Sequence, residues 1–258
     1  MLRRRCFRGK LHDRETRVVR IPVVVNLAPD DLYQRIEMRH LFCREWSLVE
    51  RHARFVASGT GLSIAPSSAS PDGGLSGHSR LVRLHTNELQ LDGQLRCLPR
   101  SLPFEDDSMQ LVVARHVTDC LGRGSGIEAE LARVVAPGGL LMVFGFNPVS
   151  SWRPWWSARI RDGLPAPRFR SARSMRRMLA EQDLSAGRSE FLGGVWPSSL
   201  PPDAIADARS SGAFWHGVWL LTARKQRFGM RPVSPLSARR RVGMNPGLLQ
   251  SSSRRIAS

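Results

Sequence analysis

Apolar positions along the chain switch between helical spacing and short continuous runs. From Asp30 to about His52, large apolar residues recur every three or four positions with charges between them, which predicts an amphipathic helix. Residues 127–135 show the same spacing. A third helix is expected to begin at Ser171, whose hydroxyl can cap the first turn. Each of these helices must bury its apolar stripe against another element.

The apolar runs predict strands. Runs over residues 111–114 and 140–146 are typical of strands buried on both faces of a parallel sheet. The helix over 127–135 and the turn Pro137-Gly138-Gly139 separate them, which predicts a βαβ unit with a right-handed crossover. A loop rich in Ser, Pro and Gly is expected from 65 to 77. Further strands are expected over residues 55–57, 81–84, 188–192 and 218–223.

The net charge of +17 comes mainly from the two ends of the chain and from one internal segment. Residues 1–20, 153–177 and 224–258 hold most of the 39 Lys and Arg and few of the 22 acids. We therefore expect a basic flexible arm over 1–24, one domain over 25–224, and a basic disordered tail over 225–258. The tails either bind the phosphates of a nucleic acid or remain solvated, and the sequence leaves both interpretations open.

Composition also bears on location and on metals. No apolar run reaches the ~20 residues of a spanning helix, and none is long enough for the core of a secretion signal. The four cysteines show no metal-binding spacing. These patterns predict a cytoplasmic protein with no transmembrane segment, no metal site and unpaired thiols.

The centre of the chain resembles a known family. Its motifs are an LPF segment, an acidic turn, an apolar strand, and a helix that leads through Pro-Gly-Gly into a second strand. They resemble the type 11 class I S-adenosylmethionine-dependent methyltransferases, and a GFNP segment after the second strand is similar to a proteobacterial subgroup of them. The resemblance implies S-adenosylmethionine as cofactor. It also implies a Rossmann-like α/β fold, with a seven-stranded, mostly parallel sheet, helices on both faces and an antiparallel last strand. The residues that carry it are 102–112, 131–141 and 145–148.

The same resemblance implies a set of cofactor-binding residues at the carboxyl ends of the strands. Gly59 and Gly61 match a glycine-rich turn after the first strand, where the main chain approaches the methionine part of the cofactor. Glu88 is the nearest acid beyond the second strand for the ribose hydroxyls, and Leu102 and His116 border the adenosine. The turn lacks the family's acid and third glycine, so an ordinary Gly-rich turn and a solvated loop glutamate remain open alternatives.

Catalytic candidates follow the strand over 111–114. His116, with Asp119 as its partner, is expected at the mouth of the crevice, where it would orient or deprotonate a methyl acceptor. The alternative is a histidine packed against the cofactor or exposed in a loop. Trp152, Trp155 and Trp156 lie among arginines, a pattern that fits a lid over the sheet, base stacking on a nucleic acid, or a membrane surface.

Two functions remain open at this level. The first is a methyltransferase whose acceptor, a small molecule or a macromolecule, the sequence does not name. The second is a catalytically inactive methyltransferase fold that acts as a basic module for binding RNA or protein. The intact region over 102–146 favours the first function. The glycine-rich turn, which lacks the family's acid and third glycine, favours the second.

Overall fold

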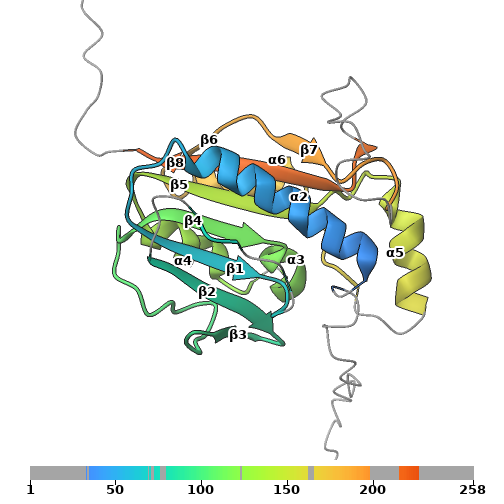
Figure 1. Ribbon diagram of the computed structural model, residues 1–258, viewed down its shortest axis with the longest axis horizontal. Helices are drawn as coiled ribbons and strands as arrows, with labels where there is room; N and C mark the ends of the chain where they lie inside the picture. Colours follow the sequence, from blue (N-terminus) through green and yellow to red (C-terminus); the bar gives the residue numbers. More distant parts are fainter. Residues whose placement is uncertain are drawn as a thin grey trace, which may run out of the picture.

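A mixed sheet of eight strands forms the centre of the molecule (Figure 1). The computed structural model describes residues 33, 35–68, 70, 73–75, 80–122, 124–161, 166–197 and 215–226. The strands are β1 (Thr60–Ala65), β2 (Arg80–Asn87), β3 (Gln90–Gly93), β4 (Met109–Arg115), β5 (Val135–Phe146), β6 (Leu184–Ala186), β7 (Glu190–Leu192) and β8 (Val218–Lys225). The helices are α2 (Ile36–Ala53), α3 (Val117–Leu121), α4 (Ile127–Val134), α5 (Trp152–Arg161) and α6 (Ala172–Ala180).

The sheet confirms the predicted fold class. Its order is β3-β2-β1-β4-β5-β8-β6, with β7 also paired to β8. The four central strands β2, β1, β4 and β5 run parallel, whereas β8 is antiparallel to β5. The described part has eight strands where seven were expected. The strand β7 lies within the strand expected over residues 188–192, whereas β3 and β6 were not expected, because runs of three or four residues carry no readable period.

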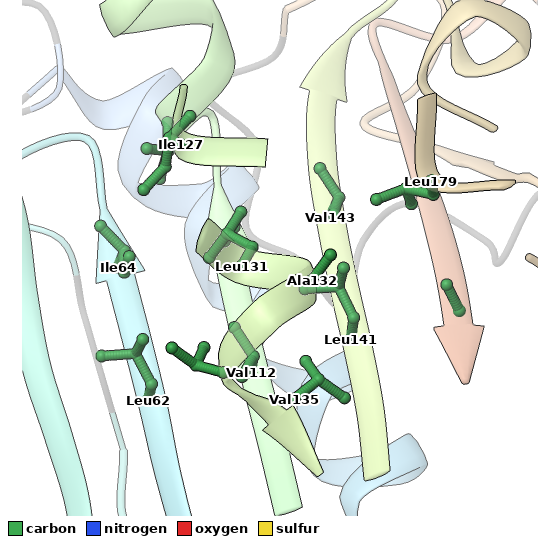
Figure 2. Close-up of a cluster of buried hydrophobic side chains, with 14 of the residues drawn as sticks. Leu62, Ile64, Val112, Ile127, Leu131, Ala132, Val135, Leu141, Val143 and Leu179 are labelled. Carbon is green, nitrogen blue, oxygen red and sulfur yellow. The ribbon is translucent and has the colours of Figure 1, made fainter. Parts of the chain in front are cut away.

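One face of the sheet is covered by α4 and α6. Ile127 and Leu131 of α4 meet Val112 of β4 and Leu141 of β5 in one apolar cluster (Figure 2). The βαβ unit expected here is confirmed, since β4 and β5 are parallel and α4 lies between them in the chain. Ser171 caps α6 as expected, and its hydroxyl accepts a hydrogen bond from the amide of Ser174 at 3.2 Å.

The Pro137-Gly138-Gly139 turn has a different place from the one expected. It lies inside β5, which already pairs with β4 at Val135 and resumes the ladder at Leu140 after a register shift. A side chain at position 139 would stand 2.8 Å from the Ala136 carbonyl oxygen, so only glycine fits this bulge. The helix α4 therefore passes directly into β5 at Val135, and the turn is a bulge within the strand.

The other face of the sheet is covered by α2 and α5. A buried stripe on α2 packs over the ends of β4 and β5, and Trp152 and Trp156 of α5 join the same cluster. These two tryptophans and Trp155 are at most 8% exposed, so they form part of the core, as the lid interpretation requires. In Figure 1, α2 crosses the sheet, and α5 stands at the end toward which the central strands point.

The predicted first strand is wrong. Residues 55–57 follow the end of α2 as a turn, and Phe55 is 77% exposed. The actual strand β1 is Thr60–Ala65, in which Leu62 and Ile64 face α4 while small residues face the other side. Because β1 has so few large side chains, its sequence gave no strand signal. The second strand is also longer than expected and reaches Asn87.

The proposed arm over 1–24 lies outside the described residues, as does the tail beyond 226. The last described strand ends at Lys225, within one residue of the expected boundary. The Lys225 ammonium donates to the carbonyls of Ala132 and Arg133 and pairs with Asp107 at 2.6 Å. This lysine therefore fastens the end of β8 to the βαβ unit.

Candidate functional site

A buried ionic network lies where β4 ends. His116 follows the strand directly in the left-handed backbone conformation, with φ of 54°. Its Nε2 lies 2.8 Å from Glu45 Oε1 of α2, and its Nδ1 lies 3.1 Å from Asp119 Oδ2 of α3. The amide of Phe146, at the end of β5, also donates to Asp119 Oδ2 at 2.8 Å. The network thus joins α2, α3, β4 and β5.

The electrostatics of this network fix the protonation of His116. Burial alone would lower its pKa, but the Glu45 and Asp119 carboxylates outweigh this and raise the pKa to about 9. Burial raises the pKa of Asp119, while its bonds to His116 and to the Phe146 amide oppose that rise. At neutral pH the imidazole is therefore a cation held between two acids, with both ring nitrogens donating.

This arrangement corrects the expected place of the catalytic pair. His116 and Asp119 do lie together, but they are 0% and 1% exposed and not at the mouth of an open crevice. The His116 ring also stacks on Phe146, with 3.9 Å between centroids. A buried imidazolium has neither access to an acceptor nor a free lone pair, so in this conformation the ring is not a general base.

Glu45 is the member of the network that the sequence did not reveal. It stands at the fourth position after Leu41 and the fourth before Val49, inside the buried stripe of α2. A fully buried acid needs a partner, because desolvation of an unpaired charge is costly. An acid within an apolar helical stripe was therefore the signal available. The identity of its partner could not be read from the sequence, because His116 is 71 residues away in the chain.

Bulky side chains fill the space around this network. Arg115 is fully buried, with its guanidinium carbon 5.6 Å from the ring centroid of Phe42 and 5.4 Å from that of Trp46. The Tyr33 hydroxyl lies 3.2 Å from Cys120 Sγ. The end of β4 is therefore packed and leaves little room for a ligand against the strand itself.

Gly59 and Gly61 are at the wrong edge of the sheet for a cofactor loop. Gly61 lies inside β1 and pairs with Leu111 near the start of β4. A side chain there would stand 2.9 Å from Leu81 Cδ1, so this glycine lets adjacent strands pack. Gly59 precedes the strand and lies against Gln110. The chain that leaves the carboxyl end of β1 instead begins at Pro66.

Glu88 and Leu102 also have structural surroundings. Glu88 is exposed at the turn between β2 and β3, with φ of 53°. The Leu102 side chain is buried in the α4-side core. Its amide donates to Glu130 Oε2 at 2.7 Å, and its carbonyl accepts from Arg133 Nη2 at 3.0 Å. The LPF segment is therefore anchored to α4.

A hollow of about 410 Å³ opens beside the carboxyl end of β1 and the middle of β2. The Thr86 hydroxyl donates to the Pro66 carbonyl at 2.7 Å and so ties the loop after β1 to the end of β2. The Ser70 hydroxyl is buried and has no hydrogen-bond partner among the described residues. A second hollow of about 400 Å³ lies farther back along β2 and shares Arg83 and Gln94 with the first. The first is lined by Ala65, Ser67, Ser68, Ser70, Arg83, Leu84, His85, Gly93 and Gln94.

Two site types are absent from the part of the chain that the structure covers. No group of three or more His, Cys, Asp or Glu side chains there is placed to hold a metal ion. None of its helices is long and apolar enough to cross a membrane. The three cysteines in this part, Cys43, Cys97 and Cys120, are free.

Comparisons with solved structures give remote similarities. The chain is similar to an S-adenosylmethionine-dependent methyltransferase of Thermotoga maritima described as a possible histamine N-methyltransferase (TM-score 0.49, 13% identity, 76% of this chain and 96% of that one). A methyltransferase of Mesorhizobium loti is also similar, with a TM-score of 0.43 and 11% identity over 77% of this chain and 100% of that one. The geranyl diphosphate C-methyltransferase of Streptomyces coelicolor is similar with a TM-score of 0.41 and 15% identity over 70% of this chain and 77% of that one.

The sequence match covers a shorter part of the chain than the structural similarities do. No curated protein matches the chain. Residues 74–143 match a family described as "Methyltransferase domain". The match begins within the connection between β1 and β2 and ends within β5, so it leaves out β1 and residues 66–73. It covers the region from β2 through the α4 unit, so the similarity to the family is limited to this part of the chain.

Proposed function

We propose that the chain is an S-adenosylmethionine-dependent methyltransferase that binds its cofactor in the hollow beside β1 and β2. The observation that carries the proposal is the place of this hollow, beside the carboxyl end of the central parallel strand β1 and partly within the matched region. Its volume of about 410 Å³ lies within the ~300–1,000 Å³ of small-molecule sites. The methyltransferase-domain match supports S-adenosylmethionine as the cofactor.

The lining fits a polar zwitterion. Ser70 offers a buried hydroxyl without a partner, and Ser68 and Gln94 add exposed polar groups. Arg83 is the cation in the lining and would meet the carboxylate of the cofactor. The bound cofactor would supply an activated methyl group on its sulfonium, and this chain would position the acceptor.

One anchor does not fit the family pattern. β2 ends with Thr86 and Asn87, and the acid that follows, Glu88, is exposed in the turn before β3. The lining of the hollow therefore holds no carboxylate to accept from both ribose hydroxyls. The Thr86 hydroxyl is already used on Pro66. We therefore expect weaker cofactor binding than a carboxylate would give.

His116 and Asp119 then act as positioning residues. Their bonds to Glu45 and to the Phe146 amide fix α2 and α3 against the ends of β4 and β5. These bonds would keep the ends of β4 and β5 in place where a methyl acceptor would bind. Their catalytic role as base and partner would require the network to open.

Calorimetric titration with S-adenosylhomocysteine tests the proposal. We expect binding by the unaltered chain, and loss of at least about tenfold in affinity for Ser68→Trp, since the indole would fill the hollow. Ser47→Trp is the matched control, because Ser47 is exposed on α2 and lies outside the hollow's lining. No heat at millimolar ligand, or equal affinity for both variants, would contradict the proposal.

The second candidate is a catalytically inactive basic module that binds RNA. It is favoured by the exclusion of β1 and of residues 66–73 from the family match and by the absence of a carboxylate from the hollow's lining. Removal of residues 227–258 takes away seven arginines and no acid. If this module exists, truncation should weaken RNA binding and flatten its dependence on salt. An unchanged salt slope would exclude the tail as the RNA-binding element.

A further inference from the structure

Three loops are joined at the end of the sheet where β5 stops and β8 starts. The Asn147 amide donates to the Gly217 carbonyl at 2.8 Å, and its side-chain amide donates to the His216 carbonyl at 2.9 Å. The Gly217 amide donates in turn to the Gly194 carbonyl at 3.0 Å. The Ser151 hydroxyl also donates to the Val195 carbonyl. Residues 147–151, 193–196 and 215–217 therefore form one connected surface.

This surface displays large apolar side chains. They are between 47% and 58% exposed, although the loops beneath them are well connected. Scattered single apolar residues are ordinary, but four on three joined loops form a patch that calls for a partner. We call this patch the apolar rim, and its members are Val149, Val195, Trp196 and Trp215.

The described segments that carry the apolar rim, and α5 beside them, contain cations and no acid. Residues 147–161, 191–197 and 215–217 contain no Asp or Glu. Arg153 is exposed on the first turn of α5, one turn before exposed Ser157 and two before Ile160, which is 38% exposed. Arg44 of α2 lies close enough to His216 to lower the pKa of that histidine, after the larger effect of burial. The charge around the patch suits an anionic partner.

We propose that the apolar rim and the outer face of α5 dock on an anionic lipid surface. Tryptophans next to arginines are the side chains that settle at the headgroup level of a bilayer. Val149, Val195 and Ile160 decide between lipid and nucleic acid, because aliphatic side chains offer no ring for a base to stack on but gain from burial in acyl chains. Docking here would place the sheet end, where an acceptor would approach, against the bilayer.

Vesicle co-sedimentation with the full chain tests this inference. Vesicles of phosphatidylcholine with about a quarter phosphatidylglycerol are compared with pure phosphatidylcholine, at low salt and at ~0.5 M salt, where charge attraction is largely screened. We expect binding to the anionic vesicles, part of which survives the higher salt. Trp196→Ser should lower the partition coefficient by roughly tenfold, as expected for an inserted side chain.

Phe55→Ser and Leu89→Ser are matched controls, because both side chains are at least as exposed as the apolar rim but lie outside its loops. They should leave binding unchanged. The inference fails if the unaltered chain ignores anionic vesicles, or if Trp196→Ser binds them as well as the controls do, which would leave only the basic tails as the source of attraction. It also fails if Trp196→Ser weakens binding to an RNA oligonucleotide and not to vesicles.

Discussion

The two faces of the sheet are stabilised in different ways. On the α4 side, Leu131 and its neighbours form an apolar cluster between α4, α6 and the sheet, with one buried ion pair, Arg170–Glu128, beside it. On the α2 side, the apolar cluster surrounds Glu45 and His116, two ionised groups that are 71 residues apart in the chain. The α4 side depends mainly on volume and burial, whereas the end of β4 depends on a network of paired charges. The α4 side is also the region of the family match.

The largest effect is expected from His116→Ala. It leaves the Glu45 and Asp119 carboxylates buried without the cation between them, and the loss of one partner from a buried ionic group costs about 3–5 kcal/mol. The free energy of unfolding from urea denaturation checks this. His52→Ala is the control, since the His52–Glu190 pair is partly exposed and should contribute less than ~1 kcal/mol. A smaller loss for His116→Ala than for this control would contradict the ionic account.

Leu131→Ala should have the next largest effect. Leu131 is 1% exposed in the α4-side cluster, and truncation of a buried leucine costs about 2–4 kcal/mol. The same urea titration measures it, with Leu89→Ala, on an exposed turn, as control. Unlike the loss for His116→Ala, this loss should be the same at pH 6 and pH 9.5.

The pH dependence of stability separates the two faces further. His116 has its pKa raised to about 9, so its stabilising contribution is complete below about pH 6.5 and is lost as pH rises through 9. We expect the unfolding free energy to fall by about 3 kcal/mol between pH 6 and pH 9.5. Glu45→Gln removes one cause of the raised pKa and should move the fall to lower pH.

The smallest effect is expected at the start of α6. Ser171→Ala removes the hydroxyl that accepts from the Ser174 amide and should cost about 1 kcal/mol. Thermal unfolding followed by circular dichroism is sufficient to detect it. Ser157→Ala, on the exposed face of α5, should leave the midpoint unchanged.

The elements that the sequence predicted well are those whose signals are local. The α4 unit shows a helical stripe flanked by two apolar runs, and Ser171 stands before its own helix. The first strand failed because the small residues Gly61 and Ser63 interrupt its large apolar side chains, so the usual apolar run is missing. A side chain at position 61 would meet Leu81 of the neighbouring strand β2. The cofactor loop was therefore expected at Gly59 and Gly61, which lie at the start of β1 and not at its carboxyl end.

The site was predictable only in part. His116 and Asp119 are three residues apart, and their contact follows from one helical turn. The third member, Glu45, arrives through the packing of α2, which no local pattern encodes. The hollow beside β1 and β2 was also invisible, because Ser68 and Gln94 are ordinary loop residues in the sequence. Long-range packing decides both features.

The position of β8 has a consequence for how the chain is made. This strand is the last one described, yet it lies inside the sheet and pairs with β5, β6 and β7. Until residue 225 has left the ribosome, the long edge of β5 has no neighbour and offers its backbone to any other unpaired strand. A chain that stops short of β8 would therefore aggregate through that edge, even with the whole α4 unit intact.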